Sequence, residues 1–146
     1  MAVERTANAE WQGDLLSGSG KVSTKSGVIR DATVKWSSRA EAADENTSPE
    51  ELIAAAHATC VAMALAGGLA KAGTPPQRLE TEATATFDKV GEGFRMTTMR
   101  ITIRGQVEGL DEEGFRQAAE QAKENCPVSQ ALKGNVDVSL DAALLR

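Results

Sequence analysis

Aromatic side chains are scarce in this chain of 146 residues, and none of them is tyrosine. Phe and Trp make up 3% of the residues, and Asp plus Glu outnumber Lys plus Arg by 21 to 16, which gives a formal charge of −5. Nucleic-acid-binding surfaces combine clustered basic side chains with aromatic side chains that stack on bases. The composition therefore argues against nucleic acid as a partner.

Long hydrophobic runs are missing as well. The longest unbroken stretch of small or apolar residues, 60–70, spans eleven positions, about half of the roughly 20 that a membrane-spanning helix needs. The first four residues, Met1 to Glu4, contain no apolar signal core. We therefore expect a soluble, cytoplasmic protein with no membrane partner.

Cysteine is limited to two residues, Cys60 and Cys126. Small secreted scaffolds carry many more cysteines in shorter chains, and the wide separation of these two lacks the paired short spacings of a zinc site. Two free thiols buried in a core are one interpretation of this count.

The length fits a single domain over residues 1–146. In the first 40 residues, β-prone side chains such as Val22 and Trp36 alternate with glycines, which predicts short strands joined by tight turns. Residues 37–46 are charged or small and predict a loop too polar for the core, and this loop carries Arg39.

A helix begins clearly at Ser48, which can cap the N-terminus while Pro49 takes the first helical position. Glu51 lies three residues after Ser48, as a capping box requires. Small residues cover nearly all faces of residues 54–66, which predicts a central helix that is buried all round. Gly73 and the prolines after it end this helix.

The second half of the chain predicts a long hairpin from residues 79–88 and 94–107, followed by two helices and a strand. The first of these helices opens at Asp111, and its apolar stripe consists of Phe115, Ala119, Ala122 and Cys126. A short helix over 128–133 and a strand over 136–140 complete the order. This order indicates an α+β fold with mostly antiparallel sheets around the long central helix.

The chemistry of a cysteine depends on its surroundings. A thiol becomes a nucleophile when a cation, a helix N-terminus or hydrogen bonds stabilise its thiolate. Cys126 precedes Pro127 and lies near the start of the short helix, whereas Cys60 lies in mid-helix and needs a cation from elsewhere. Arg39, in the loop just before the helix that carries Cys60, is the candidate, and a solvated loop arginine is the alternative interpretation.

Glu50 lies ten residues before Cys60, about 15 Å along a straight helix axis. It can therefore reach that site only through a bridging arginine or from a second subunit. Stabilisation of the helix N-terminus is the alternative role for Glu50 and Glu51. His57, the only histidine, precedes Cys60 by one turn; it suggests either a Cys–His hydrolytic pair or a hydrogen-bonded core histidine.

Two segments together carry a resemblance to a known family. Ser48-Pro49-Glu50-Glu51-Leu52-Ile53-Ala54-Ala55-Ala56-His57-Ala58-Thr59-Cys60, followed 66 positions later by Asn125-Cys126-Pro127-Val128-Ser129, resembles the OsmC/Ohr family of thiol peroxidases. The resemblance covers nearly the whole chain. His57 and the placement of Arg39 are closer to the OsmC branch than to the Ohr branch.

This resemblance implies an intertwined homodimer with two active sites at the subunit interface. It implies that Cys60 is the peroxidatic nucleophile, that Cys126 resolves its sulfenic acid to a disulfide, and that Glu50 orients Arg39 toward the thiolate and the peroxide. We expect at least part of this ion pair to come from the partner subunit. No bound cofactor or metal is implied; the reductant is an external dithiol, such as a lipoylated protein.

The role of several apolar side chains and the existence of turnover each allow two interpretations. Apolar side chains could line a pocket that prefers organic hydroperoxides, or could simply form the core: Met63, Phe94, Met96, Met99 and Phe115. The alternative to a peroxidase is a redox-sensing or small-apolar-ligand-binding protein on the same scaffold, without significant turnover.

Overall fold

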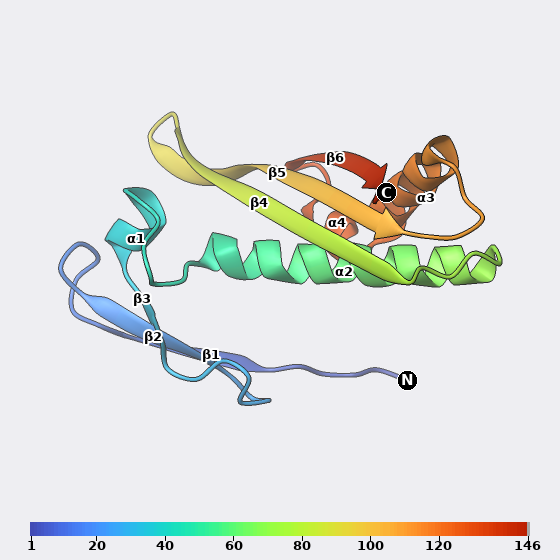
Figure 1. The fold of residues 1–146 in the computed structure, drawn as a ribbon. Coiled ribbons are helices and arrows are strands. Elements are labelled where there is room, and N and C mark those ends of the chain that lie inside the picture. Colours follow the sequence, from blue (N-terminus) through green and yellow to red (C-terminus); the bar gives the residue numbers. More distant parts are fainter. Residues whose placement is uncertain (146) are drawn as a thin grey trace. The chain divides into compact units, whose positions relative to one another are not determined.

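The computed structural model describes residues 1–145 and contains both helices and sheets, as expected for an α+β fold (Figure 1). Its residues divide between two compact units, one up to Leu52 and one from Ile53 onward. The single domain expected over residues 1–146 stays a prediction.

The first unit is built on a three-stranded antiparallel sheet. Its strands are β1 (Ala7–Gln12), β2 (Ser19–Thr24) and β3 (Ala32–Val34), in that order across the sheet. Gly20 of β2 is buried, and a Cβ there would collide with the Trp11 ring of β1. The glycine therefore lets an indole lie across the sheet. The strands predicted from the first 40 residues are confirmed, except that Trp36, expected in a strand, begins a short helix.

The loop predicted over residues 37–46 is partly wrong, because it contains a short helix, α1 (Trp36–Ala40). Ser38 of this helix is buried in spite of the polar sequence around it. Its hydroxyl donates to Asp44 at 2.9 Å and accepts from the side-chain amide of Asn46 at 3.2 Å. These hydrogen bonds make burial of the serine tolerable and fix the segment that leads into the next helix.

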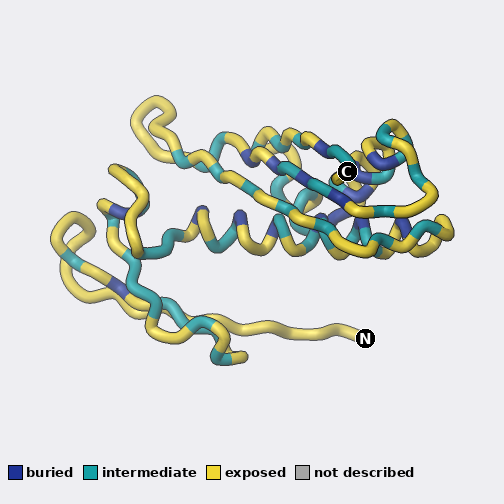
Figure 2. The backbone as a smooth tube through the Cα atoms, viewed as in Figure 1, coloured by how far each residue is buried: buried dark blue, intermediate teal, exposed yellow. Residues whose placement is uncertain are grey.

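The long helix α2 (Pro49–Lys71) begins where the sequence predicts, since the Ser48 hydroxyl accepts a hydrogen bond from the Glu51 N–H at 3.1 Å. Burial recurs on only one side of it, once per turn (Figure 2). The buried positions are Glu50, Ala54, His57, Val61, Leu65 and Leu69.

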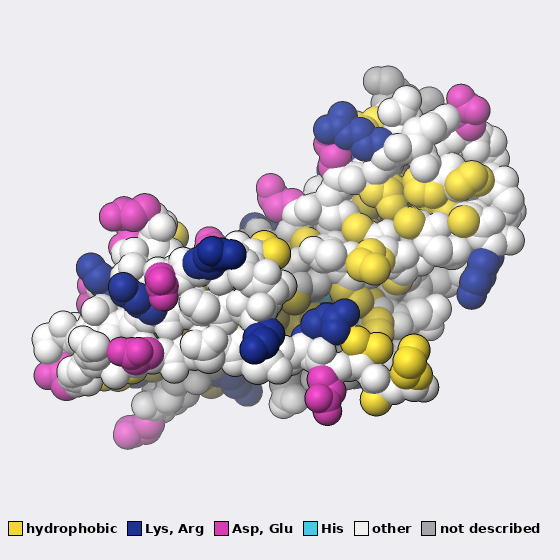
Figure 3. Space-filling view, turned by 90° about the horizontal axis from the view of Figure 1, so that it is seen from below, with side chains coloured by type: hydrophobic (Ala, Val, Ile, Leu, Met, Phe, Trp, Pro, Cys, Tyr) yellow, Lys and Arg dark blue, Asp and Glu magenta, His cyan; other side chains and the backbone are white. Residues whose placement is uncertain are grey.

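The prediction that α2 is buried all round is wrong for the single chain. Met63, on the other side of the helix, is 70% exposed. Its exposed neighbours on α2 are small or apolar, apart from Thr59: Ala55, Ala56, Gly67 and Ala70. Figure 3, which looks onto α2 from below, shows hydrophobic side chains gathered on this side. We call this surface the open face of α2.

The second unit contains a three-stranded sheet in the order β4-β5-β6. β4 (Arg78–Val90) and β5 (Gly93–Gln106) form the predicted antiparallel hairpin, and Phe87 stacks on Phe94 near its end. β6 (Asp137–Leu144), in contrast, runs parallel to β5. The expectation of mostly antiparallel sheets therefore holds with one exception, which two helices make possible by connecting β5 to β6.

These two connecting helices are α3 (Glu112–Asn125) and α4 (Pro127–Leu132). Asp111 caps α3 by accepting a hydrogen bond from the Gly114 N–H at 2.7 Å. The predicted stripe of Phe115, Ala119, Ala122 and Cys126 is buried throughout. Both helices thus lie where the sequence predicts them, although α4 begins one residue earlier, at Pro127.

The core of the second unit joins α2, β5 and α3. Leu65, Ile101 and Phe115 are each at most 1% exposed and belong to one apolar cluster. By length and composition alone, α2 could cross a membrane, with a mean hydropathy of 1.8 over its most apolar window. Because its inner side chains pack into this cluster, α2 is a core helix of the folded unit.

Candidate active site

Two cysteines that are far apart in the sequence meet between α2 and the start of α4. The Sγ atoms of Cys60 and Cys126 are 2.7 Å apart, and both residues are free thiols. Cys126 is fully buried and is the N-cap residue of α4, whereas Cys60 is half-buried. The two thiols can therefore reach each other without a large backbone movement.

The surroundings of Cys60 favour its protonated form. Burial raises the pKa of the Cys60 thiol, and the adjoining Cys126 adds to this shift. The backbone N–H of Val128, in the first turn of α4, donates to the sulfur and lowers the pKa. Among residues 53–145, no cation contributes to the shift. A reactive Cys60 thiolate therefore needs a positive group in addition to this hydrogen bond.

His57 lies one turn before Cys60 on α2 and is fully buried. Its Nε2 is 2.6 Å from the Ser129 hydroxyl of α4, and its Nδ1 has no hydrogen-bond partner among the described residues. Burial lowers the pKa of this imidazole, which favours its neutral form. Neither ring nitrogen bonds to Cys60, so the structure contradicts a Cys–His hydrolytic pair and agrees with a core histidine.

In the first unit, Arg39 and Glu50 form an ion pair. The Arg39 Nη2 is 2.9 Å from the Glu50 Oε1, and the Arg39 Nε lies 3.1–3.2 Å from both carboxylate oxygens. The Glu50 side chain is 10% exposed and that of Arg39 is 35% exposed. Both partners come from one chain, so the contact between them needs no second subunit.

An apolar cavity of about 320 Å³ adjoins this ion pair. Among residues 1–145, Arg39 is the only arginine that lines it, and the other lining residues are mostly apolar: Ala9, Trp11, Leu15, Val22, Val34, Lys35, Trp36, Pro49 and Leu52. No sequence pattern predicted this cavity, because its walls come from segments that are separate in the sequence. Its composition suits an apolar molecule that carries one polar group toward the guanidinium.

The apolar side chains that could line a pocket or form the core do not act as one group. Met99 and Phe115 are fully buried in the core of the second unit, while Met63 and Phe94 are 70% and 47% exposed. Met96 packs against the edge of that core. The alternative interpretation, that core packing explains such residues, holds for Met99 and Phe115.

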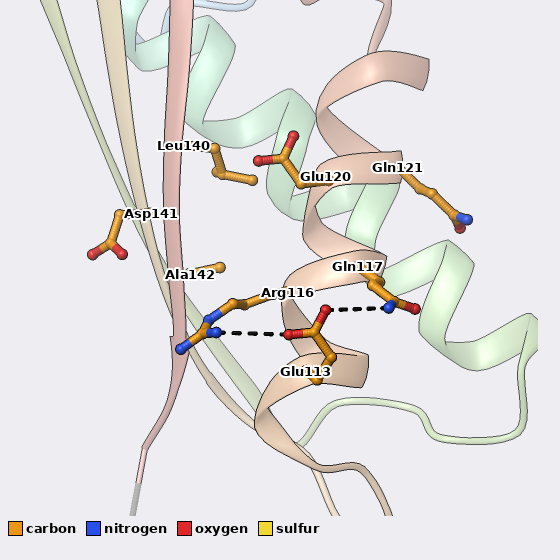
Figure 4. A pocket seen from close by; sticks show the side chains of 8 residues that line it. All are labelled: Glu113, Arg116, Gln117, Glu120, Gln121, Leu140, Asp141 and Ala142. Atoms are coloured by element: carbon orange, nitrogen blue, oxygen red, sulfur yellow. Dashed lines mark hydrogen bonds and ion pairs between the residues drawn. The ribbon is translucent and has the colours of Figure 1, made fainter.

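A second, polar groove of about 430 Å³ lies between α3 and β6. Figure 4 shows Arg116 and Gln117 both directed at the carboxylate of Glu113, at 3.6 and 3.2 Å. Each charged group of this groove thus has a charged partner and does not converge on a ligand. Over residues 1–145, no three His, Cys, Asp or Glu side chains group closely enough to hold a metal ion.

An α+β chain whose two cysteines meet at a helix start defines a thiol-based redox protein. The family model of OsmC-like proteins matches residues 42–141, a range that contains the α2 and α4 segments. The chain belongs to the OsmC family.

Relatives with known names agree with this assignment. Peroxiredoxin OsmC of Escherichia coli K12 is 40% identical over 144 residues, which cover 99% of each chain. The organic hydroperoxide resistance protein OhrA of Bacillus subtilis is 31% identical over 129 residues, 85% of this chain and 87% of that protein. The higher identity to OsmC favours the OsmC branch.

Solved structures show the same fold. The organic hydroperoxide resistance protein OhrB of Bacillus subtilis superposes with a TM-score of 0.74 at 28% identity, covering 94% of this chain and 97% of that one. An organic hydroperoxide resistance protein from Elizabethkingia anophelis gives a TM-score of 0.77 at 24% identity, covering 99% and 100%.

Proposed function

We propose that this chain reduces organic hydroperoxides through a Cys60 sulfenic acid and a Cys60–Cys126 disulfide. The chain is a cysteine-based peroxidase, as the names peroxiredoxin and organic hydroperoxide resistance protein of its relatives support. The observation that carries the proposal is the 2.7 Å separation of two free thiols, one buried and one half-buried. A thiol pair of this kind can be oxidised to a disulfide within one subunit.

The reaction begins with the Cys60 thiolate attacking the terminal oxygen of the hydroperoxide. The S–O bond forms as the O–O bond breaks, and the departing alkoxide takes up a proton to become an alcohol. The Cys126 thiol then attacks the sulfenic sulfur, which forms the disulfide and releases water. An external dithiol, with a lipoyl group as the expected class, restores both thiols by exchange.

Arg39 supplies the cation that Cys60 needs. Burial raises the pKa of Cys60, and the single N–H of Val128 opposes this effect; a guanidinium beside the sulfur would add charge stabilisation. Glu50 holds the Arg39 fork with three hydrogen bonds and thereby orients it. The charge also stabilises the alkoxide as the O–O bond breaks.

The active form in this proposal is a homodimer with its active sites at the subunit interface. The open face of α2 is apolar, and Met63 is 70% exposed on it; a second copy of the chain would remove this face from water. Ten residues of helix separate Glu50 from Cys60, about 15 Å of rise. We therefore assign the Arg39–Glu50 pair of one subunit to the Cys60 of the partner subunit.

The substrate class follows from the cavity beside Arg39. Its apolar walls suit the hydrocarbon part of an organic hydroperoxide, while the guanidinium faces the peroxide oxygens. The chain acts in the cytoplasm, where reducing conditions keep its thiols free. The reaction in this proposal needs no bound cofactor, because the two thiols supply the two electrons that reduce the peroxide.

The decisive experiment compares wild type with Cys60→Ser, using cumene hydroperoxide as substrate and dihydrolipoamide as reductant. Wild type should consume peroxide continuously, and intact-mass analysis should show the loss of two hydrogens on oxidation. Cys60→Ser should do neither. Oxidation of the wild type without continuous turnover would favour the redox-sensing alternative. No mass change in the wild type would refute the proposal.

A further inference from the structure

The reaction proposed above leaves one buried titratable residue without a role. His57 is fully buried, and its neighbours on the same stripe of α2 are apolar except for Glu50 one turn beyond Ala54. An aliphatic side chain would pack into the same stripe without any polar atoms to satisfy. The cost of burying an imidazole is offset here by one contact, to the Ser129 hydroxyl.

The direction of this hydrogen bond follows from the other ring nitrogen. The His57 Nδ1 is buried without a partner among the described residues. A proton on Nδ1 would leave a buried N–H without an acceptor, which is more costly than a buried lone pair. The proton therefore lies on Nε2, and His57 donates to the Ser129 hydroxyl at 2.6 Å.

Besides the packing of Val128 and Leu132 on the core, polar contacts attach the start of α4 to α2: this bond, the sulfur pair and the Val128 N–H on the Cys60 sulfur. His57 precedes Cys60 by three residues, and Ser129 follows Cys126 by three residues, so the contacts lie about one turn apart on each helix. α4 has only six residues, no side-chain cap and no fully buried residue. So short a helix is not stable alone, and its position depends on what anchors it.

We propose that the His57–Ser129 hydrogen bond positions the resolving cysteine, by holding the first turn of α4 on α2 after Cys60 has been oxidised. This inference rests on the proposed function. In the reduced protein the two thiols help to hold α4 in place. When Cys60 becomes a sulfenic acid, the added oxygen disturbs that contact, and the His57–Ser129 bond remains.

The step that this bond serves is disulfide closure. The Cys126 sulfur attacks the Cys60 sulfur, the S–S bond forms, the S–O bond breaks, and the hydroxyl leaves as water with the thiol proton. An alignment error of about 1 Å between reacting atoms can slow a reaction on the order of 100-fold. His57 and Ser129 are thus positioning residues, since neither of them touches the peroxide.

Rapid quenching separates the two steps. Wild type, Ser129→Ala and Ser129→Thr are mixed with one equivalent of cumene hydroperoxide, and dimedone-trapped sulfenic acid and disulfide are measured by intact mass. Ser129→Ala should form sulfenic acid within about threefold of the wild-type rate, but should close the disulfide about tenfold more slowly, as the loss of one hydrogen bond implies. Ser129→Thr, which keeps the hydroxyl, should restore closure.

Gln130→Ala, at an exposed position next to Ser129 on α4, is the matched control and should close at the wild-type rate. Unchanged closure in Ser129→Ala overturns the inference, as does equal slowing of both steps. Failure of the proposed function looks different, because the wild type itself then forms no sulfenic acid. NMR of His57 in reduced wild type gives a test that needs no variant: an Nε2–H proton that is hydrogen-bonded and slow to exchange is expected, and an Nε2 without a hydrogen bond overturns the inference.

Discussion

The Sγ atoms of Cys60 and Cys126 lie 2.7 Å apart, although 66 positions separate the two residues in the sequence. One sulfur comes from the middle of α2 and the other from the residue that caps α4. A sulfenic acid on one sulfur can therefore react with the other thiol to form a disulfide within a single chain.

Replacement of the resolving cysteine should limit the enzyme to one turnover. In Cys126→Ser, Cys60 still reduces one equivalent of peroxide, but its sulfenic acid finds no thiol and is oxidised further to sulfinic and sulfonic acids. Intact-mass analysis after excess cumene hydroperoxide should show two or three added oxygens. A wild-type-like steady state with dihydrolipoamide would contradict the assignment of Cys126.

Removal of the guanidinium should make Cys60 less acidic. In Arg39→Ala, the pH profile of Cys60 alkylation by iodoacetamide should move to higher pH, and kcat/KM should fall on the order of 100-fold, as for the loss of one transition-state donor. Glu50→Gln should cause a smaller loss. Arg78→Ala, which removes an exposed arginine paired with Glu80, is the control. An unchanged alkylation profile in Arg39→Ala would count against the role of Arg39.

A charge on the open face of α2 should weaken the dimer. Met63→Glu places a carboxylate where the second copy would pack, whereas Val28→Glu replaces an equally apolar side chain that is 85% exposed outside α2. Sedimentation velocity should show a dimer for wild type and Val28→Glu, and a larger monomer fraction for Met63→Glu. A monomeric wild type would rule out this dimer.

The core should not tolerate a methyl group at Gly105. A Cβ at this position of β5 would collide with the ring of Phe115 from α3, so Gly105→Ala should lower the free energy of unfolding by about 1–3 kcal/mol. Gly93, at the start of β5, has open space around it. Gly93→Ala should leave stability nearly unchanged. Urea unfolding, followed by circular dichroism, measures both variants.

Stability should fall on mild acidification because of His57. Burial lowers the pKa of His57 in the folded protein, so below about pH 6.5 the unfolded chain binds a proton that the folded chain does not. The free energy of unfolding should therefore decrease as pH falls below 6.5, by at most about 1.4 kcal/mol per pH unit from this group. The decrease ends at the lower pKa of the folded state.

Urea unfolding of the reduced protein at pH 7.5, 6.5 and 5.5 tests this dependence. His57→Gln should lose this part of the pH dependence, and Ser129→Ala, which keeps the imidazole, should retain it. The same slope in wild type and His57→Gln would show that other groups cause the acid sensitivity.

Local chemistry made several elements predictable from the sequence. Ser48 and Asp111 are capping residues whose hydrogen bonds involve backbone N–H groups only three residues away, so each helix start is encoded locally. The β4–β5 hairpin was predictable for the same reason, since alternating apolar and polar residues on both sides of a glycine turn are enough to predict two paired strands. The meeting of Cys60 with Cys126 was not encoded locally; it followed from the family resemblance.

Other features depend on contacts that no local pattern reports. α1 has five residues and no side-chain cap, and its buried Ser38 is stabilised by partners six and eight positions away. The alternating pattern of β6 is the same for parallel and antiparallel pairing. The small residues of α2 look alike on every side, so composition could not separate its buried stripe from its open face.

The parallel pairing of β6 with β5 has a consequence for biosynthesis. α3 and α4 form the crossover between these two strands, and such a crossover is held at both ends only once its second strand has docked. A chain emerging from the ribosome exposes Cys60 well before β6 is available. The topology thus places Cys126 in a connection that is complete only when β6 has paired with β5, so the resolving thiol takes its final position late in folding.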